Sequence, residues 1–251
     1  MDLKLSVAYF SPTMGTKKAV TQLAELISNK PNYIDLTLPK NRVHTIEFSE
    51  TDLLLVACPV YAGQLPPVEG LLSNLKGNHT PCIIVASYGN RHYDDTLAQM
   101  NEILSHQGFY TIGAMACVIP HIFSSLLGQN RPDKKDLAQF TNFAHTINQK
   151  LESMDLSPIT LPGNPHPAPK ASKPILKTWD SALCTNCGIC VGACPTQAID
   201  ATTLVCNDDL CINCMRCSHV CKEKARSFDA TNVRNYLESN YLEPRSLELF
   251  L

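Results

Sequence analysis

The chain has 251 residues, a formal net charge of −2 and 44% hydrophobic residues. This length suits one medium domain joined to a smaller one, and the near balance of charge gives no electrostatic basis for binding nucleic acid or an anionic membrane. No apolar run approaches the roughly 20 residues that a membrane span needs, and the N-terminal residues read as a strand and not as a signal peptide, so we expect a cytoplasmic protein.

The first 151 residues alternate between apolar, strand-like runs and helical patterns. Strands are predicted at 3–9, 33–38, 52–57, 82–86 and 110–118, and helices at 17–28, 68–75, 94–106 and 134–151. Asp133 is suited to cap the last helix. Strands that alternate with helices predict a parallel sheet with helices on both faces, and five strands indicate the doubly wound order 2-1-3-4-5.

Three loops at the predicted carboxyl ends of the strands carry candidate binding residues, because ligands of such sheets bind beyond those ends. The loop 11–17 leads into a helix whose free N–H groups suit a phosphate, and Ser11, Thr13 and Thr16 add hydroxyl donors. It lacks the Walker A pattern of nucleoside triphosphate sites. The loops 58–66 and 87–94 each join a glycine to tyrosines able to flank a flat ring.

His121 follows the fifth predicted strand and has two interpretations. It is either a proton donor or hydrogen-bonding wall at the edge of a bound ring, or a solvated or capping loop residue. Three cysteines in the apolar runs, Cys58, Cys82 and Cys117, are expected to be small buried hydrophobic residues. The proline-rich stretch 161–175 predicts an extended linker and ends a first domain of residues 1–160.

Eight cysteines after the linker form two copies of the spacing C-x2-C-x2-C-x3-C. The copies are Cys184, Cys187, Cys190 and Cys194, followed by Pro195, and Cys211, Cys214, Cys217 and Cys221, followed by Lys222. This is the spacing of bacterial-type iron–sulfur ligation, and two copies predict two 4Fe–4S clusters. Since the fourth ligand comes from the other motif, Cys221 is assigned to the first cluster and Cys194 to the second.

Disulfides and structural zinc are the alternative interpretations of these cysteines. Disulfides suit small secreted scaffolds, and zinc sites place a longer gap between two C-x-x-C pairs, so the spacing favours clusters over both. Cys206 lies between the motifs and fits no ligand position.

The tail 229–251 has apolar residues at helical spacing from Val233 to Tyr241, and Pro244 then breaks the pattern. One interpretation is that the tail packs back on a domain and fixes how the two domains are oriented. The other is that it docks a partner.

Residues 176–228 resemble the two-cluster ferredoxins, and the three loops within 1–155 resemble those of the flavodoxin family, which binds FMN. That resemblance implies phosphate contacts from Ser11, Thr13, Met14, Gly15, Thr16 and Lys17. It implies contacts along one side of the flavin ring from Pro59, Val60, Tyr61, Ala62 and Gly63, and along the other from Ser87, Tyr88, Gly89, Asn90, Arg91 and Tyr93. Flavodoxins usually carry glycine where Met14 stands, so the neighbouring Gly15 is the alternative residue for a left-handed conformation.

The whole chain resembles the bacterial and archaeal flavodoxin–ferredoxin fusion proteins. The resemblance implies an α/β flavodoxin-like fold, a doubly wound five-stranded parallel sheet, joined to a small α+β two-cluster ferredoxin domain (176–228) and a C-terminal helical tail (229–251). It implies an electron-transfer flavoprotein that passes electrons between a soluble redox protein partner, two 4Fe–4S clusters and FMN. The alternatives are an FMN-dependent reductase of a small acceptor, such as a quinone or nitro compound, and a redox sensor.

Overall fold

A six-stranded sheet with the order β10-β7-β6-β4-β1-β2 forms the centre of the computed structural model, which describes residues 3–170 and 175–251. Its strands are β1 (Lys4–Tyr9), β2 (Asn32–Asp35), β4 (Asp52–Pro59), β6 (Thr80–Tyr88), β7 (Phe109–Val118) and β10 (Glu248–Phe250). The first five pair in parallel in the flavodoxin-like order 2-1-3-4-5. The prediction of a five-stranded sheet is wrong by one strand, because β10 adds to β7 in the antiparallel direction.

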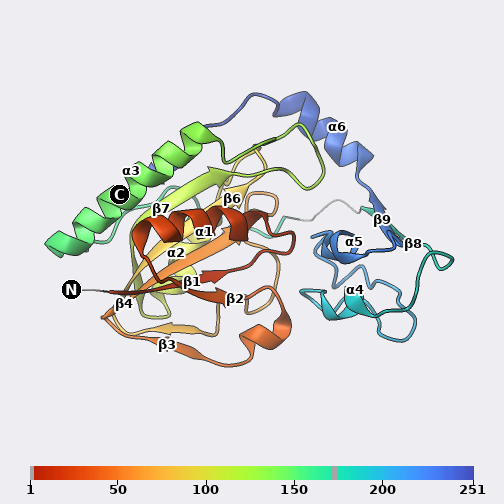
Figure 1. Cartoon of the computed structure of the whole chain (residues 1–251), viewed down its shortest axis with the longest axis horizontal. Helices are drawn as coiled ribbons and strands as arrows, with labels where there is room; N and C mark the ends of the chain where they lie inside the picture. Colours follow the sequence, from red (N-terminus) through yellow and green to blue (C-terminus); the bar gives the residue numbers. More distant parts are fainter. Residues whose placement is uncertain (1–2, 171–174) are drawn as a thin grey trace.

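Helices cover both faces of this sheet (Figure 1). On one face, α1 (Gly15–Ile27) and α3 (Lys134–Ser153) pack against each other and bury one apolar core. On the other, α2 (Thr96–Ser105) and the segment 68–77 bury a second core. The predicted cap of α3 is confirmed, since the Asp133 carboxylate accepts from the N–H groups of Lys135 and Asp136.

The helix predicted at 68–75 is wrong. These residues form successive turns that lead into β5 (Leu75–Gly77), which pairs in parallel with β3 (Ile46–Phe48); a short 3-10 helix, η1 (Pro39–Arg42), precedes β3. Gly70 takes a left-handed conformation with φ of 63°, which a continuous helix does not contain. The turns still bury Leu71 and Leu72, so they satisfy the apolar spacing without a helix.

The second domain contains an antiparallel strand pair and two short helices. These elements are β8 (Leu176–Trp179), α4 (Ile189–Gly192), α5 (Arg216–Val220) and β9 (Arg226–Asp229). Residues at equivalent places in the two cysteine motifs share left-handed backbone conformations: Asn186 with Asn213, Gly188 with Met215, and Gln197 with Lys224. The two motifs therefore have the same local backbone fold.

The two segments that connect the domains run along the first domain. The coil before residue 171 is held there where Gln64 Nε2 donates to the Ala168 carbonyl at 2.8 Å, and residues 171–174 of the expected linker lie outside the described residues. After β9 the chain forms α6 (Thr231–Asn240) and returns to the sheet as β10. The tail is thus a helix followed by a strand, not helical throughout.

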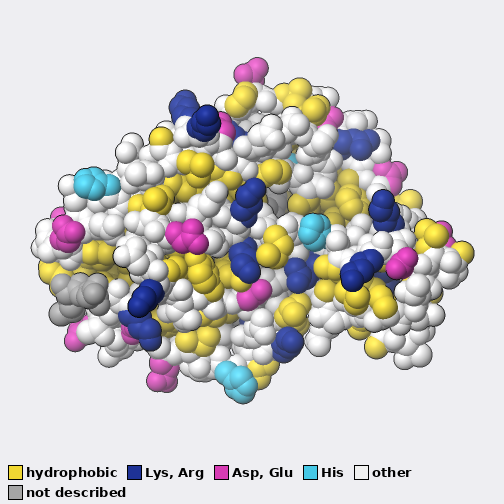
Figure 2. Space-filling view, in the orientation of Figure 1, with side chains coloured by type: hydrophobic (Ala, Val, Ile, Leu, Met, Phe, Trp, Pro, Cys, Tyr) yellow, Lys and Arg dark blue, Asp and Glu magenta, His cyan; other side chains and the backbone are white. Residues whose placement is uncertain are grey.

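The second domain lies against the end of the sheet where the parallel strands finish (Figure 1). On the face shown in Figure 2, basic and acidic side chains are interspersed without a stripe of one sign. Within the described residues, no helix combines the length and the apolar character that crossing a membrane requires.

Candidate functional site

Hydrogen bonds fix the shape of the predicted phosphate loop between β1 and α1. Ser11 is 2% exposed; its N–H donates to Thr37 Oγ1 and its Oγ accepts from the Lys17 N–H, both at 3.0 Å. The hydroxyls of Thr16 and Ser87 lie 2.8 Å apart, which ties this loop to the end of β6, where the predicted third loop begins. The structure thus brings together two of the three loops that the sequence singled out.

Met14 itself takes the left-handed conformation at the start of α1, with φ of 67°. The expectation that Gly15 takes it is wrong. Gly15 instead packs closely against Ile119, the residue after β7, because a Cβ on Gly15 would lie 3.0 Å from Ile119 Cδ1. The left-handed conformation costs about 1 kcal/mol for a residue that has a side chain, and Met14 therefore carries this cost. The side chain of Met14 is 44% exposed.

The second loop, after β4, lies next to the second cysteine motif. Tyr61 and Gln64 exchange backbone hydrogen bonds of 2.8 and 2.9 Å, and Gly63 has φ of 86°, which favours glycine. Tyr61 packs in one apolar cluster with Ile212 and Cys214 of the second domain. Burial raises the pKa of the Tyr61 hydroxyl well above its usual value.

Several residues of the third loop, which the resemblance places beside a flavin, contact the C-terminal tail. Tyr88 and Tyr93 are each 3% exposed, and the Tyr93 hydroxyl donates to Glu248 Oε2 at 2.7 Å. The Asn90 amide donates to the carbonyls of Tyr241 and Glu243 at 2.6 and 2.9 Å. The side chains of Tyr93 and Asn90 thus bind the tail. Arg91 is held by Asp94, with Nη1 and Oδ2 2.5 Å apart.

His121 packs its ring directly on Gly89, where a Cβ would overlap the imidazole. Its Nδ1 accepts from the Phe123 N–H at 3.1 Å, and burial lowers the pKa of His121 to about 4. The ring is therefore neutral at pH 7, with one nitrogen already used. This environment argues against the expected role as a proton donor and favours packing.

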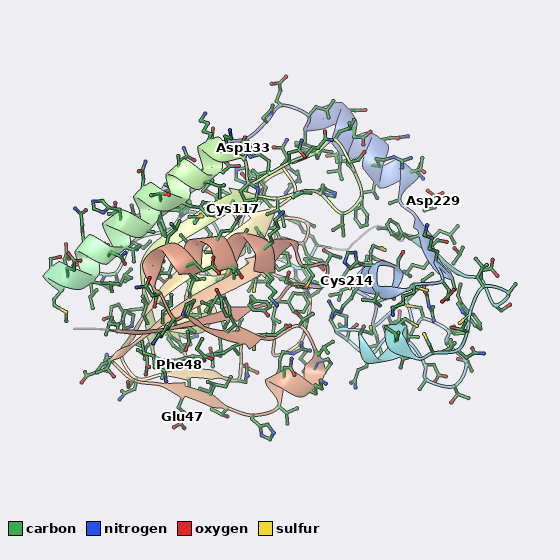
Figure 3. All side chains as sticks on the ribbon, in the orientation of Figure 1. Glu47, Phe48, Cys117, Asp133, Cys214 and Asp229 are labelled. Carbon is green, nitrogen blue, oxygen red and sulfur yellow. The ribbon has the colours of Figure 1, made fainter. Side chains whose placement is uncertain are left out.

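The four cysteines predicted to bind the second cluster, which we call the second cysteine group, line one cavity in the second domain. They are Cys194, Cys211, Cys214 and Cys217. Cys194 Sγ accepts from the Ala198 N–H at 3.2 Å, and Cys214, labelled in Figure 3, stands at the border with the first domain. Cys206, which fits no ligand position in the sequence, lies on the wall of the same cavity.

The remaining predicted ligands lie nearer the surface. Cys184, Cys190 and Cys221 are half-buried and Cys187 is exposed. All twelve cysteines are free thiols, so the disulfide interpretation is not realised. Cys58, Cys82 and Cys117 are fully buried in the first domain, as predicted.

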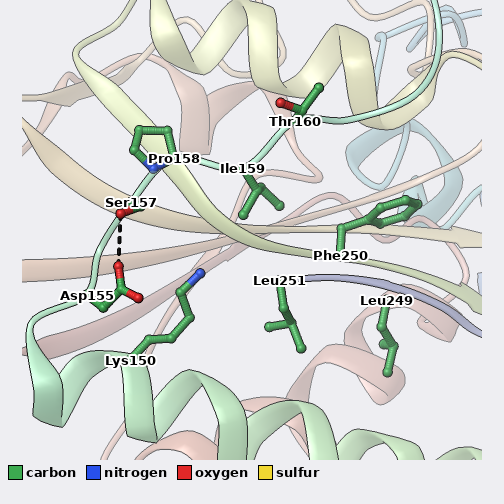
Figure 4. Close-up of a pocket in the computed structure, with 9 residues that line it drawn as sticks. All are labelled: Lys150, Asp155, Ser157, Pro158, Ile159, Thr160, Leu249, Phe250 and Leu251. Carbon is green, nitrogen blue, oxygen red and sulfur yellow. Dashed lines mark hydrogen bonds between the residues drawn. The ribbon is translucent and has the colours of Figure 1, made fainter.

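A separate groove lies between the end of α3, the coil after it and β10 (Figure 4). Its walls are Lys150, Asp155, Ser157, Pro158, Ile159, Thr160, Leu249, Phe250 and Leu251. The Lys150 ammonium donates to the Ile112 carbonyl, near the start of β7. None of the predicted site residues lines this groove.

Residues 177–200 match the family model described as 4Fe-4S binding domain, and this range contains the whole first cysteine motif. No curated protein matches the chain. A solved flavodoxin of Streptococcus pneumonia TIGR4 is similar, with 18% identity, a TM-score of 0.41 and coverage of 58% of this chain and 98% of that one.

Other similar structures are a putative flavoprotein from Bacteroides uniformis and a flavone reductase. The first has 10% identity and a TM-score of 0.41 and covers 57% of this chain and 99% of its own. The flavone reductase has 10% identity and a TM-score of 0.37, and the match covers 61% of this chain and 64% of the reductase chain. The chain joins a domain with the flavodoxin-like strand order to a segment with a 4Fe–4S binding motif.

Proposed function

We propose that this chain is an electron-transfer flavoprotein that binds FMN and two 4Fe–4S clusters and exchanges electrons with a soluble redox protein. One observation carries the proposal. Cys214 and Ile212 of the second cysteine motif share an apolar cluster with Tyr61, in a loop at the carboxyl end of the sheet. Ligands of doubly wound sheets bind at that end, so the second cluster and the flavin would be neighbours.

The loops fit the phosphate and the ring of FMN. Among the described residues, the N-cap residue Met14 makes no side-chain capping hydrogen bond, and of the first-turn N–H groups of α1 that of Lys17 is taken by Ser11 Oγ. The N–H groups of Gly15 and Thr16 are the ones that would face an anion. The left-handed Gly63 and the partly buried Tyr61 form a wall on one side of the expected ring site. Bound there, FMN would supply the exchange between one-electron and two-electron chemistry.

The repeated backbone of the cysteine motifs supports two clusters, although the family model covers only the first motif. Three pairs of left-handed residues stand at the same offsets from their cysteines in both copies. Since these conformations aim the cysteine side chains, the second motif is shaped like the first. Soft thiolate sets of this spacing are the ligands that 4Fe–4S clusters require.

The two groups would have different tasks, because they differ in position. The group of Cys194, Cys211, Cys214 and Cys217 adjoins the first domain, where Cys214 is 9% exposed. The first group includes the exposed Cys187. We therefore propose that a redox protein partner meets the chain at the first group and that electrons pass to the flavin through the second.

Cofactor analysis and spectroscopy test this function. Anaerobically purified protein is expected to hold about eight irons, eight sulfides and one FMN per chain. Reduction of the clusters with a low-potential donor should then bleach the flavin band in the same molecule. A preparation that carries both cofactor types but shows no electron exchange between them would contradict the proposal.

A further inference from the structure

Arg216 of the second domain reaches into the phosphate loop of the first. It is the first residue of α5 and stands directly before Cys217 in the second cysteine motif. Its Nη1 donates to the carbonyl of Pro12, between Ser11 and Thr13, at 2.6 Å. Its Nε is buried and has no hydrogen-bond partner within the part of the chain that the structure describes. An unpartnered buried donor is costly unless a ligand satisfies it.

The loop's own lysine is directed elsewhere. Lys17 Nζ lies over the ring of Tyr9, 5.5 Å from its centroid. Its backbone N–H is taken by Ser11 Oγ. Arg216, and not Lys17, therefore places its charge at the backbone of the phosphate loop, beside the start of α1. A planar guanidinium with several donors matches a phosphate better than an ammonium does.

We propose that Arg216 binds the phosphate of FMN, so that the cluster-bearing segment completes the flavin site. This inference rests on the proposed function, because it takes FMN as the ligand of the loop. In this arrangement Nη1 keeps its bond to Pro12 while the guanidinium charge stands beside the phosphate at the N–H groups of Gly15 and Thr16. Phosphate recognition and the second cluster then share one short helix.

Titration of flavin-free, cluster-containing protein with FMN and with riboflavin tests the proposal, with flavin fluorescence as the readout. Riboflavin has the same ring but no phosphate. Arg216→Gln keeps a donor for the Pro12 carbonyl and removes the charge. We expect it to weaken FMN binding at least about tenfold and to leave riboflavin binding unchanged. Arg216→Lys keeps the charge without the planar guanidinium, so its affinity for FMN should lie between those of the wild type and of Arg216→Gln.

Arg42→Gln is the matched control, because Arg42 also bridges the domains, with Nη2 donating to the Pro195 carbonyl at 3.0 Å. We expect it to leave the ratio of FMN to riboflavin affinity unchanged. Iron content and visible absorbance of each variant verify that the clusters are retained. Equal weakening of both flavins by Arg216→Gln, or no change in either, overturns the phosphate role. Wild-type protein that binds neither flavin instead refutes the proposed function.

Discussion

His121 shows how burial at a single residue makes stability depend on pH. Its pKa is lowered to about 4 by burial, whereas an unfolded histidine titrates near about 6.5. The folded state therefore keeps its full stability above about pH 6.5 and loses it as pH falls toward 4, because the unfolded chain takes up the proton first. Between pH 7 and 5 we expect this residue to account for about 2 kcal/mol of lost unfolding free energy.

Urea unfolding of the intact chain under anaerobic conditions, followed by circular dichroism, measures this loss. His121→Asn keeps an acceptor for the Phe123 N–H but does not titrate in this range, so its stability should fall less over the same pH interval. Parallel pH profiles for the two proteins would show that His121 is not the group responsible.

At the residue scale, the cysteine motifs are easier to recognise in the sequence than the contacts of the third loop with the tail. Iron–sulfur ligation requires a particular cysteine spacing within one short segment, so the motif can be recognised from that segment alone. Asn90 and Tyr93 are different, because their hydrogen-bond partners, Tyr241 and Glu248, lie in the tail. No local pattern in the loop 87–94 indicates that the end of the chain occupies these side chains.

One side chain of the third loop, Asn90, makes three hydrogen bonds with the backbone of the tail. Asn90 donates to two tail carbonyls and accepts from the Arg245 N–H at 2.9 Å. Asn90→Gly allows the φ of 66° but removes these bonds, which should cost about 2–3 kcal/mol. We expect much faster hydrogen exchange at the backbone amides of β10, measured by mass spectrometry.

Asn240→Ala is the comparison for this effect. Asn240 is exposed, and its amide donates only to the Tyr236 carbonyl within α6. Its loss should leave the exchange of β10 unchanged. If both variants leave β10 equally protected, then other contacts hold the tail, such as the bond from Arg131 Nη1 to the Arg245 carbonyl at 3.0 Å.

Elements were predictable where local pattern and tertiary structure agree. Four of the five parallel strands, β1, β4, β6 and β7, are mainly apolar, and α3 begins at a side chain of capping type. The segment 68–75 has helical spacing, but Pro66, Pro67 and Gly70 favour turns that bury the same leucines. The strand β10 has three residues, and its pairing with β7 is a long-range contact that no periodicity indicates.

For the whole molecule, the contact between the domains predicts how electron transfer depends on concentration. Phe123 and Phe228 meet edge-on at 6.0 Å in a cluster that also holds Met215. This contact holds the second cysteine motif beside the first domain. Under the proposed function, flavin reduction through the clusters should therefore be first order. We expect the same stopped-flow rate constant when the protein is diluted about a hundredfold, as for any intramolecular step.

Phe228→Ala should slow this step, because it loosens the contact without removing a cysteine. Val205→Ala is the control, since Val205 is 58% exposed in the same domain and lies outside that cluster. A rate that rises in proportion to protein concentration would mean that electrons pass between molecules, and the domain contact would then have no part in the transfer.

The pairing of β10 with β7 also determines the order in which the two domains can be completed during synthesis. β10 follows both cysteine motifs in the chain, yet it is a strand of the first domain's sheet. A ribosome must release all eight motif cysteines before that sheet can be finished. Until then the edge of β7 remains open to pairing with other chains. The first domain can therefore be completed only after the second has been synthesised. The second domain is then joined to the first on both sides, by the coil that precedes it and by the tail that follows it.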